Sequence, residues 1–231
     1  MWDKAFSKRF NAEEIIERKY LILSAMKEIL EGKKWKRLID LGCGSGYYSR
    51  VFASKNTKVV GVDRSETQLD IATKIEKEQG LGIEYIKSDL RKLRKIKSYT
   101  FDVALLVYVL MEISDKKTIG RILNEAHRVL KRGGILIIAQ VHPFNFNRES
   151  SILTKTLSKK GDSYFVNGTP VITKALLKDG KYMVFGDDHH YTLEFLLNSL
   201  IEAGFALDSI KELSCNEKYP THIIMVGEKK K

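Results

Sequence analysis

The sequence predicts an α/β protein in which a mostly parallel, doubly wound sheet is covered by helices on both faces. From residue 37 to residue 141, short apolar runs typical of buried strands alternate with stretches whose apolar residues recur at helical spacing. Two of the runs, at 101–107 and 135–141, are almost entirely apolar, which indicates strands buried on both faces of a sheet. Two further strands near the C-terminus bring the expected sheet to seven.

The first part of the chain supplies five of these strands and the helices between them. An amphipathic helix is expected at 12–31, with Asn11 as its N-cap and Gly32 at its end. Ser65 is expected to cap a helix that ends near residue 79, and Ser114 or Asp115 to cap one that ends near residue 130. The strands are expected at 37–41, 58–62, 83–87, 101–107 and 135–141.

The alternation stops at residue 142 and resumes only at Thr192, which is expected to cap a helix that ends at Gly204. Residues 142–190 carry aromatic side chains and turn signals, and Val166–Thr169 suggests a tight hairpin. The last strands, near 206–213 and 222–227, have no helix between them and should pair as an antiparallel hairpin. We therefore expect one domain over 1–231, with residues 1–32 as a helical lid and 142–190 as an inserted cap.

A glycine-rich stretch directly follows the first strand and leads into a helix. Gly42, Gly44 and Gly46 would let the backbone approach a ligand closely, and the helix start offers free N–H groups. Asp63, at the end of the second strand, follows Gly42 by 63 − 42 = 21 positions. That spacing suits a carboxylate that accepts hydrogen bonds from ribose hydroxyls. The pattern predicts a nucleotide site at the carboxyl edge of the sheet.

Two details favour a nucleotide that carries an amino acid over a dinucleotide. A dinucleotide loop would have its third glycine at position 47, where this chain has Tyr47, and the glycine stands at Gly46 instead. Asp40 lies two residues before Gly42, where its carboxylate would repel a pyrophosphate and attract an ammonium group.

These motifs resemble those of the class I S-adenosylmethionine-dependent methyltransferases, particularly the small soluble members. The resemblance covers 40–46, 60–65, 88–89, 101–110 and 130–137, with a weaker similarity at 191–205. It implies a Rossmann-like fold, S-adenosylmethionine as the methyl donor and S-adenosylhomocysteine as the product. It also implies a cofactor-binding set made of Asp40, Gly42, Gly44, Gly46, Asp63, Arg64, Ser88, Asp89, Leu90 and Val107.

One block departs from the family pattern. Many relatives follow the fourth strand with a Leu-Glu-His triplet, whereas Leu110 here precedes Met111 and Glu112. The usual histidine is therefore missing, and we assign no catalytic role to this block.

Transfer of a methyl group from a sulfonium mainly requires alignment of the reactants and exclusion of water, and a base is needed only when the acceptor must lose a proton. His142, after the fifth strand, and His189 and His190, before the last helix, are the candidates for such a base or for acceptor contacts. Each could equally be a hydrogen-bonded structural histidine. Their spacing with Asp187 or Asp188 matches no metal-binding motif, so no metal site is expected.

The acceptor is expected to be a small molecule with an oxygen or nitrogen nucleophile, because aromatic residues in the cap suit a small or apolar compound. The formal net charge of +11 keeps RNA open as an alternative, although no Asn/Asp-Pro-Pro-Tyr/Phe run follows the fourth strand. A non-catalytic cofactor-binding partner protein is a second alternative, and an enzyme that methylates a protein is a third. Two cysteines and no signal or membrane-spanning segment predict a cytoplasmic protein away from membranes, and no pattern indicates the oligomeric state.

Overall fold

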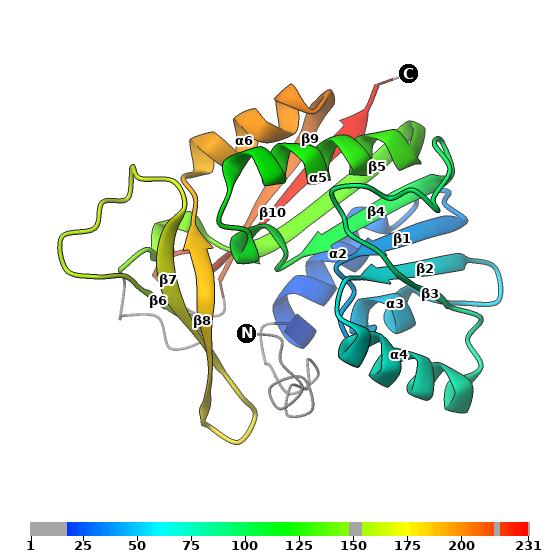
Figure 1. Cartoon of the computed structure of the whole chain (residues 1–231), viewed down its shortest axis with the longest axis horizontal. Helices are drawn as coiled ribbons and strands as arrows, with labels where there is room; N and C mark the ends of the chain where they lie inside the picture. Colours follow the sequence, from blue (N-terminus) through cyan, green and yellow to red (C-terminus); the bar gives the residue numbers. More distant parts are fainter. Residues whose placement is uncertain (1–17, 148–153, 215–217, 231) are drawn as a thin grey trace.

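A seven-stranded sheet lies at the centre of the computed structural model, which describes residues 18–147, 154–214 and 218–230 (Figure 1). The strand order is β3-β2-β1-β4-β5-β10-β9, and β10 alone runs against its two neighbours while the other pairs are parallel. The strands are β1 (Arg37–Leu41), β2 (Lys58–Asp63), β3 (Glu84–Lys87), β4 (Phe101–Val107), β5 (Leu130–Val141), β9 (Phe205–Leu213) and β10 (His222–Lys229). The predicted doubly wound sheet with its antiparallel C-terminal pair is confirmed.

Helices cover both faces of this sheet, and three of the predicted caps are in place. Side-chain oxygens of Ser65, Asp115 and Thr192 accept hydrogen bonds from backbone N–H groups of the helices that they begin. The α-helices are α2 (Leu23–Leu30), α3 (Tyr47–Phe52), α4 (Glu66–Gln79), α5 (Lys116–Val129) and α6 (Leu193–Glu202). Single helical turns form η2 (Arg18–Ile22), η3 (Leu110–Glu112) and η4 (Pro143–Asn145).

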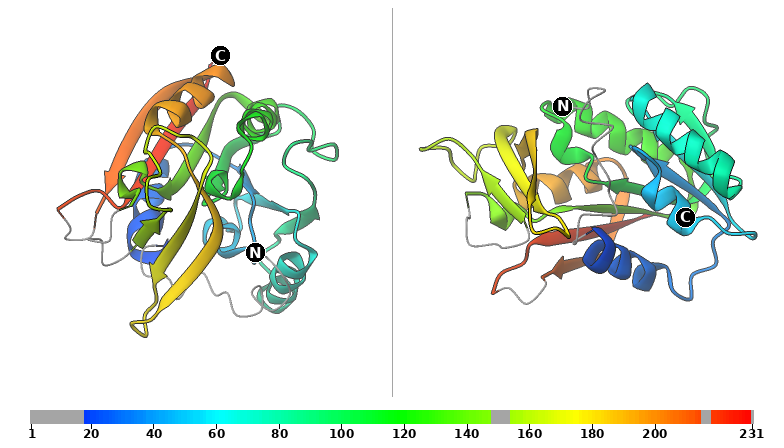
Figure 2. Two further views of the ribbon diagram at one scale, coloured as in Figure 1. Left: turned by 60° about the vertical axis from the view of Figure 1, so that its left-hand side comes forward. Right: turned by 90° about the horizontal axis from the view of Figure 1, so that it is seen from below.

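The alternation of side chains along β4 shows how the sheet divides the core into two layers. Leu105 and Val107 pack in one core layer with residues of α2 and α3, whereas Ala104 and Leu106 pack in the other with residues of α5 and α6. All four are buried. Figure 2 shows α2 (blue) and α5 (green) on opposite faces of the sheet. This central strand ends at the edge of the sheet where the order turns back from β1 to β4, which is where such sheets bind ligands.

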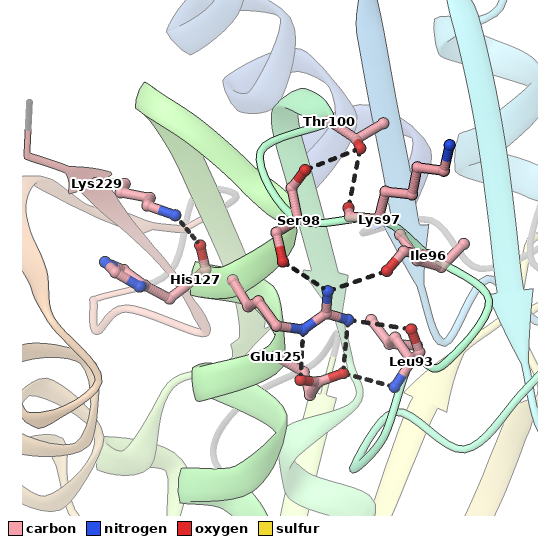
Figure 3. Close-up of polar contacts among 9 residues, drawn as sticks. Leu93, Ile96, Lys97, Ser98, Thr100, Glu125, His127 and Lys229 are labelled. Atoms are coloured by element: carbon pink, nitrogen blue, oxygen red, sulfur yellow. Dashed lines mark hydrogen bonds and ion pairs between the residues drawn. The ribbon is translucent and has the colours of Figure 1, made fainter.

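The loop between β3 and β4 is fastened to α5 by one arginine. The guanidinium of Arg128 donates to the carbonyl oxygens of Leu93 and Ile96, to Ser98 Oγ and to the carboxylate of Glu125 (Figure 3). The same carboxylate accepts the N–H of Leu93 at 2.6 Å. Four polar backbone or hydroxyl groups of the loop are thus satisfied from one helix turn.

A second, three-stranded antiparallel sheet, β6-β7-β8, occupies most of the predicted cap. It consists of β6 (Thr154–Leu157), β7 (Thr169–Leu176) and β8 (Tyr182–His190). The predicted hairpin at Val166–Thr169 is wrong, because the tight turn lies at 177–181 around Gly180. Gly168 ends a long β6–β7 connection instead, and its N–H donates to the carbonyl of His190.

The cap contacts the seven-stranded sheet at its base. The hydroxyl of Tyr191 donates to the carbonyl of Ile113, in the segment between η3 and α5. On the cap side, the N–H of Thr192 donates to Asn167 Oδ1 at 2.7 Å. These contacts bring the cap next to the carboxyl end of β4.

Two boundaries differ from the sequence-based expectation. β5 begins at Leu130 and not at residue 135, because the backbone continues directly from α5 into pairing with Phe101. Of the helix expected at 12–31, residues 18–30 are described, and Met26 and Ile29 pack into the core. Asn11 and most of the proposed lid lie outside the described residues, so the lid stays a prediction. No helix in the described ranges is long and apolar enough to cross a bilayer.

Candidate functional site

A cavity of about 540 Å³ opens at the carboxyl ends of β1, β2 and β4, where the sequence predicts a nucleotide site. Its walls include eight of the ten predicted cofactor residues and a run of residues after β4. The eight are Asp40, Gly42, Gly44, Asp63, Arg64, Asp89, Leu90 and Val107. Eight of ten predicted positions therefore meet at one cavity, although they span residues 40–107.

The glycine loop forms the floor of this cavity on the side of β1. Gly42, Gly44 and Gly46 all have positive φ, between +53° and +80°, a region that side chains rarely adopt. Gly46 does not line the cavity, and a Cβ there would come within 2.2 Å of the Tyr85 hydroxyl oxygen. The third glycine is thus required by the packing of β3 under the loop.

Asp63 holds the glycine loop and the start of α4 together. Its Oδ2 accepts the N–H of Gly44 at 2.9 Å, and its Oδ1 accepts the N–H of Ser65 at 2.8 Å. Burial raises the pKa of this carboxyl above its usual value, and the two N–H groups oppose that rise by favouring the charged form. A carboxylate has about four acceptor positions, so Asp63 retains capacity for hydroxyl donors from the cavity.

Asp40 is buried at the end of β1 and still reaches the cavity wall. Its Oδ2 accepts the hydroxyl of Ser49 at 2.6 Å. Burial raises the pKa of Asp40 to about 6, and the nearby negative charge of Asp63 acts in the same direction. An approaching cation would stabilise the ionised form of this carboxyl.

The edge of the cavity after β3 is formed by charged residues. Asp89 and Arg91 form an ion pair in which Arg91 Nε lies 2.8 Å from Asp89 Oδ2, and this hydrogen bond lowers the pKa of Asp89. Ser88, also predicted as a cofactor residue, does not line this cavity, and its N–H donates to the carbonyl of Asp63. Ser88 therefore contacts the backbone of Asp63 at the end of β2.

The three predicted catalytic histidines do not line this cavity. His142 Nδ1 accepts the N–H of Phe144 at 3.0 Å, and its Nε2 lies 2.9 Å from Glu212 Oε1. His190 Nε2 lies 2.8 Å from the carbonyl oxygen of Tyr164. Burial lowers the pKa of both rings, and the neighbouring carboxylate of Glu212 opposes this shift at His142.

His189 lies on β8 opposite Pro170. A catalytic role for any of the three histidines stays a prediction. Among the described residues, no three His, Cys, Asp or Glu side chains cluster closely enough to hold a metal ion.

On the far wall, sequence reasoning identified Val107 and Tyr108 as candidates at the end of the fourth strand, and it named no site residue beyond them. This wall is built by the ends of β4 and the first turn of α5, including Tyr108, Glu112, Asp115 and Thr118. Asp115 was recognised only as a helix cap, and its carboxylate indeed accepts the N–H groups of Lys117 and Thr118. The position of these residues directly after the central strand is the signal that could have identified them.

The comparisons with known proteins agree with this geometry. Residues 39–138 match the family model described as a methyltransferase domain. A ubiquinone biosynthesis O-methyltransferase of Caulobacter is 32% identical over 64% of this chain, and the match spans 56% of that protein's length. The chain therefore spans little more than half of this relative.

Two solved structures share the fold over nearly the whole chain. The PH0226 protein from Pyrococcus horikoshii has a TM-score of 0.71 at 18% identity, covering 99% of this chain and 100% of that one. A Burkholderia thailandensis 1,6-didemethyltoxoflavin-N1-methyltransferase, with bound 1,6-didemethyltoxoflavin and S-adenosylhomocysteine, has a TM-score of 0.61 at 16% identity, covering 91% and 78%. At these identities the likeness concerns the fold, and the family model identifies residues 39–138 as a methyltransferase domain.

Proposed function

We propose that the protein transfers a methyl group from S-adenosylmethionine to an oxygen or nitrogen atom of a small molecule. The observation that carries this proposal is the acidic cavity. Five carboxylates and two guanidinium groups line it, in a chain whose formal net charge is +11. The donor is cationic at its sulfonium and its ammonium groups, and such a cavity attracts it.

The residues of the cavity suit the parts of this donor. In this proposal Asp63 accepts the ribose hydroxyls and Asp40 faces the ammonium group, while Gly42 and Gly44 leave room for close backbone approach. When bound, the donor supplies an electrophilic methyl carbon and a neutral thioether leaving group. The protein's own task is to align the acceptor with that carbon and keep water out.

The same cavity argues against RNA as the acceptor. Phosphate groups near Asp89, Glu112 and Asp115 would meet like charge along the cavity wall. The named activities of the relatives, ubiquinone biosynthesis and toxoflavin methylation, concern small molecules and support the same choice. The cytoplasm, where both the donor and such acceptors are available, is the proposed compartment.

The decisive experiment is to incubate the protein with methyl-tritiated S-adenosylmethionine and an extract of the cells from which the gene comes. We expect label in the small-molecule fraction, unaffected by RNase. Label in RNase-sensitive material would favour RNA, and no label from a protein that binds S-adenosylhomocysteine would favour a non-catalytic partner.

Asp40 predicts a pH dependence of cofactor binding. Because its pKa in the free protein is raised from 3.8 to about 6, it is mostly protonated below pH 6 and cannot pair with an ammonium group there. Affinity for S-adenosylhomocysteine, measured by calorimetry, should therefore fall as the pH is lowered from 7.5 to 5.

Asp40→Asn should bind weakly at pH 7.5 and lose this pH dependence. Because folding raises the pKa of Asp40 from 3.8 to about 6, the folded protein holds this proton more tightly than the unfolded chain does. The contribution of Asp40 to the stability of the free protein is therefore largest at low pH and is lost as the pH rises through about 6. If the wild-type protein bound S-adenosylhomocysteine equally well at both pH values, Asp40 would not pair with the ammonium group.

A further inference from the structure

Tyr108 has a backbone conformation that is costly for a bulky side chain. It follows the last residue of β4 and has φ +58°, in the left-handed region that glycine and asparagine adopt far more readily. Its N–H donates to the carbonyl of Ala139 at 2.8 Å, which extends the pairing of β4 with β5 and fixes this conformation. Strained residues of this kind concentrate at functional sites.

This residue lies beside the cofactor loop. Tyr108 lines the cavity together with its neighbours Val107 and Val109. Val109 contacts the glycine loop so closely that a Cβ on Gly42 would lie 2.4 Å from its Cγ2 atom. The segment 107–109 thus lies against the glycine loop and forms part of the same cavity wall.

The ring of Tyr108 is supported by a histidine far away in sequence. His222, the first residue of β10, presents its ring edge-on at a centroid distance of 5.8 Å and an angle of 84°. Its side chain is buried, and its Nδ1 lies 3.0 Å from Thr221 Oγ1. Because β10 runs antiparallel to β5, its first residue lies at the carboxyl edge of the sheet, next to Val141.

We propose that Tyr108 contacts the methyl acceptor and orients its nucleophilic atom toward the methyl donor, with His222 fixing the position of the tyrosine ring. This inference rests on the proposed function and adds to it the residue that holds the acceptor. An aromatic face with a polar hydroxyl suits a planar acceptor that carries a hydrogen-bonding group. The lone pair of the nucleophile forms the new bond to the methyl carbon, the carbon–sulfur electron pair stays on sulfur, and any acceptor proton leaves to solvent.

The chain offers a matched control for the backbone strain. Tyr99 is also a tyrosine with a left-handed backbone, at φ +54°, but its side chain is 59% exposed and does not line the cavity. Asparagine tolerates this conformation at both positions. Tyr108→Asn and Tyr99→Asn therefore relieve the same kind of strain, and only the first removes a cavity side chain.

The test uses the labelling assay with tritiated donor and serial dilutions of the small-molecule extract. Tyr108→Asn should lower label incorporation at least tenfold and raise the extract concentration that gives half-maximal rate. Tyr108→Phe, which keeps the ring and loses the hydroxyl, should recover only part of the rate. Affinity of both variants for S-adenosylhomocysteine should stay within twofold of the wild type, and Tyr99→Asn should label at the wild-type rate.

The outcomes separate this inference from the proposed function. If the wild type labels the extract and Tyr108→Asn does so equally well, the role of Tyr108 is wrong and the function stands. If Tyr108→Asn loses cofactor affinity in parallel with its rate, Tyr108 belongs to the cofactor site and the inference is also wrong. If the wild type itself incorporates no label, the proposed function fails, and this inference fails with it.

Discussion

Replacement of Asp63 by alanine is expected to lower the affinity for S-adenosylhomocysteine at least tenfold. The substitution removes the acceptor for the ribose hydroxyls and releases the N–H groups of Gly44 and Ser65 from the carboxylate. Hydrogen bonds to a charged group contribute about 1.5–3 kcal/mol each, so the loss of even one accounts for tenfold. Titration calorimetry measures the affinity directly.

The control for this variant is Asp70→Ala, which removes an exposed carboxylate from α4 without touching the cavity. It should bind the ligand as the wild type does. If a folded Asp63→Ala protein also kept wild-type affinity, Asp63 would not bind the ribose, and its role would be limited to stabilising the glycine loop.

The second large effect is expected at Arg128, where alanine should lower the free energy of unfolding by about 2–4 kcal/mol. The guanidinium connects α5 to the loop after β3 through the carbonyls of Leu93 and Ile96 and the carboxylate of Glu125. Without it, that carboxylate and the carbonyls lose their partners in a half-buried environment. Denaturant unfolding, followed by circular dichroism, gives the change.

Arg121→Ala is the matched control, because it removes an exposed arginine from the same helix. Its effect should stay within about 0.5 kcal/mol, as for most surface substitutions. Arg128→Lys should be intermediate, since lysine keeps the charge and loses the planar donor fork. Equal stability of Arg128→Ala and Arg121→Ala would show that the contacts of Arg128 contribute nothing measurable.

The elements that could be predicted from the sequence are those whose signal is local. The apolar runs of β4 and β5, the caps at Ser65 and Thr192, and the glycine loop each depend on residues within about one helical turn. Because the ends of parallel strands meet at one edge of a sheet, the same local signals also brought Asp40, Asp63 and Asp89 to one cavity.

The remaining features depend on contacts between residues far apart in the chain. β8 includes the segment Asp187–His190, which has little strand propensity by itself, and pairing with β7 determines its conformation. Likewise, no local pattern shows that His142 faces Glu212, 70 residues later, or that Tyr108 adopts a left-handed backbone.

The position of the cap in the chain affects how freely its length can change. Residues 142–190 leave from the end of β5 and return at the start of α6, and the base of the cap is held by the contact of Tyr191 with Ile113. Among the described residues of this segment, those in strands belong to the separate sheet β6-β7-β8 and not to the seven-stranded sheet. The entropy of closing such an excursion rises only with the logarithm of its length, by about 0.6 kcal/mol for each doubling. Insertions and deletions in this segment are therefore thermodynamically inexpensive, and related chains can diverge in acceptor while the donor site keeps its geometry.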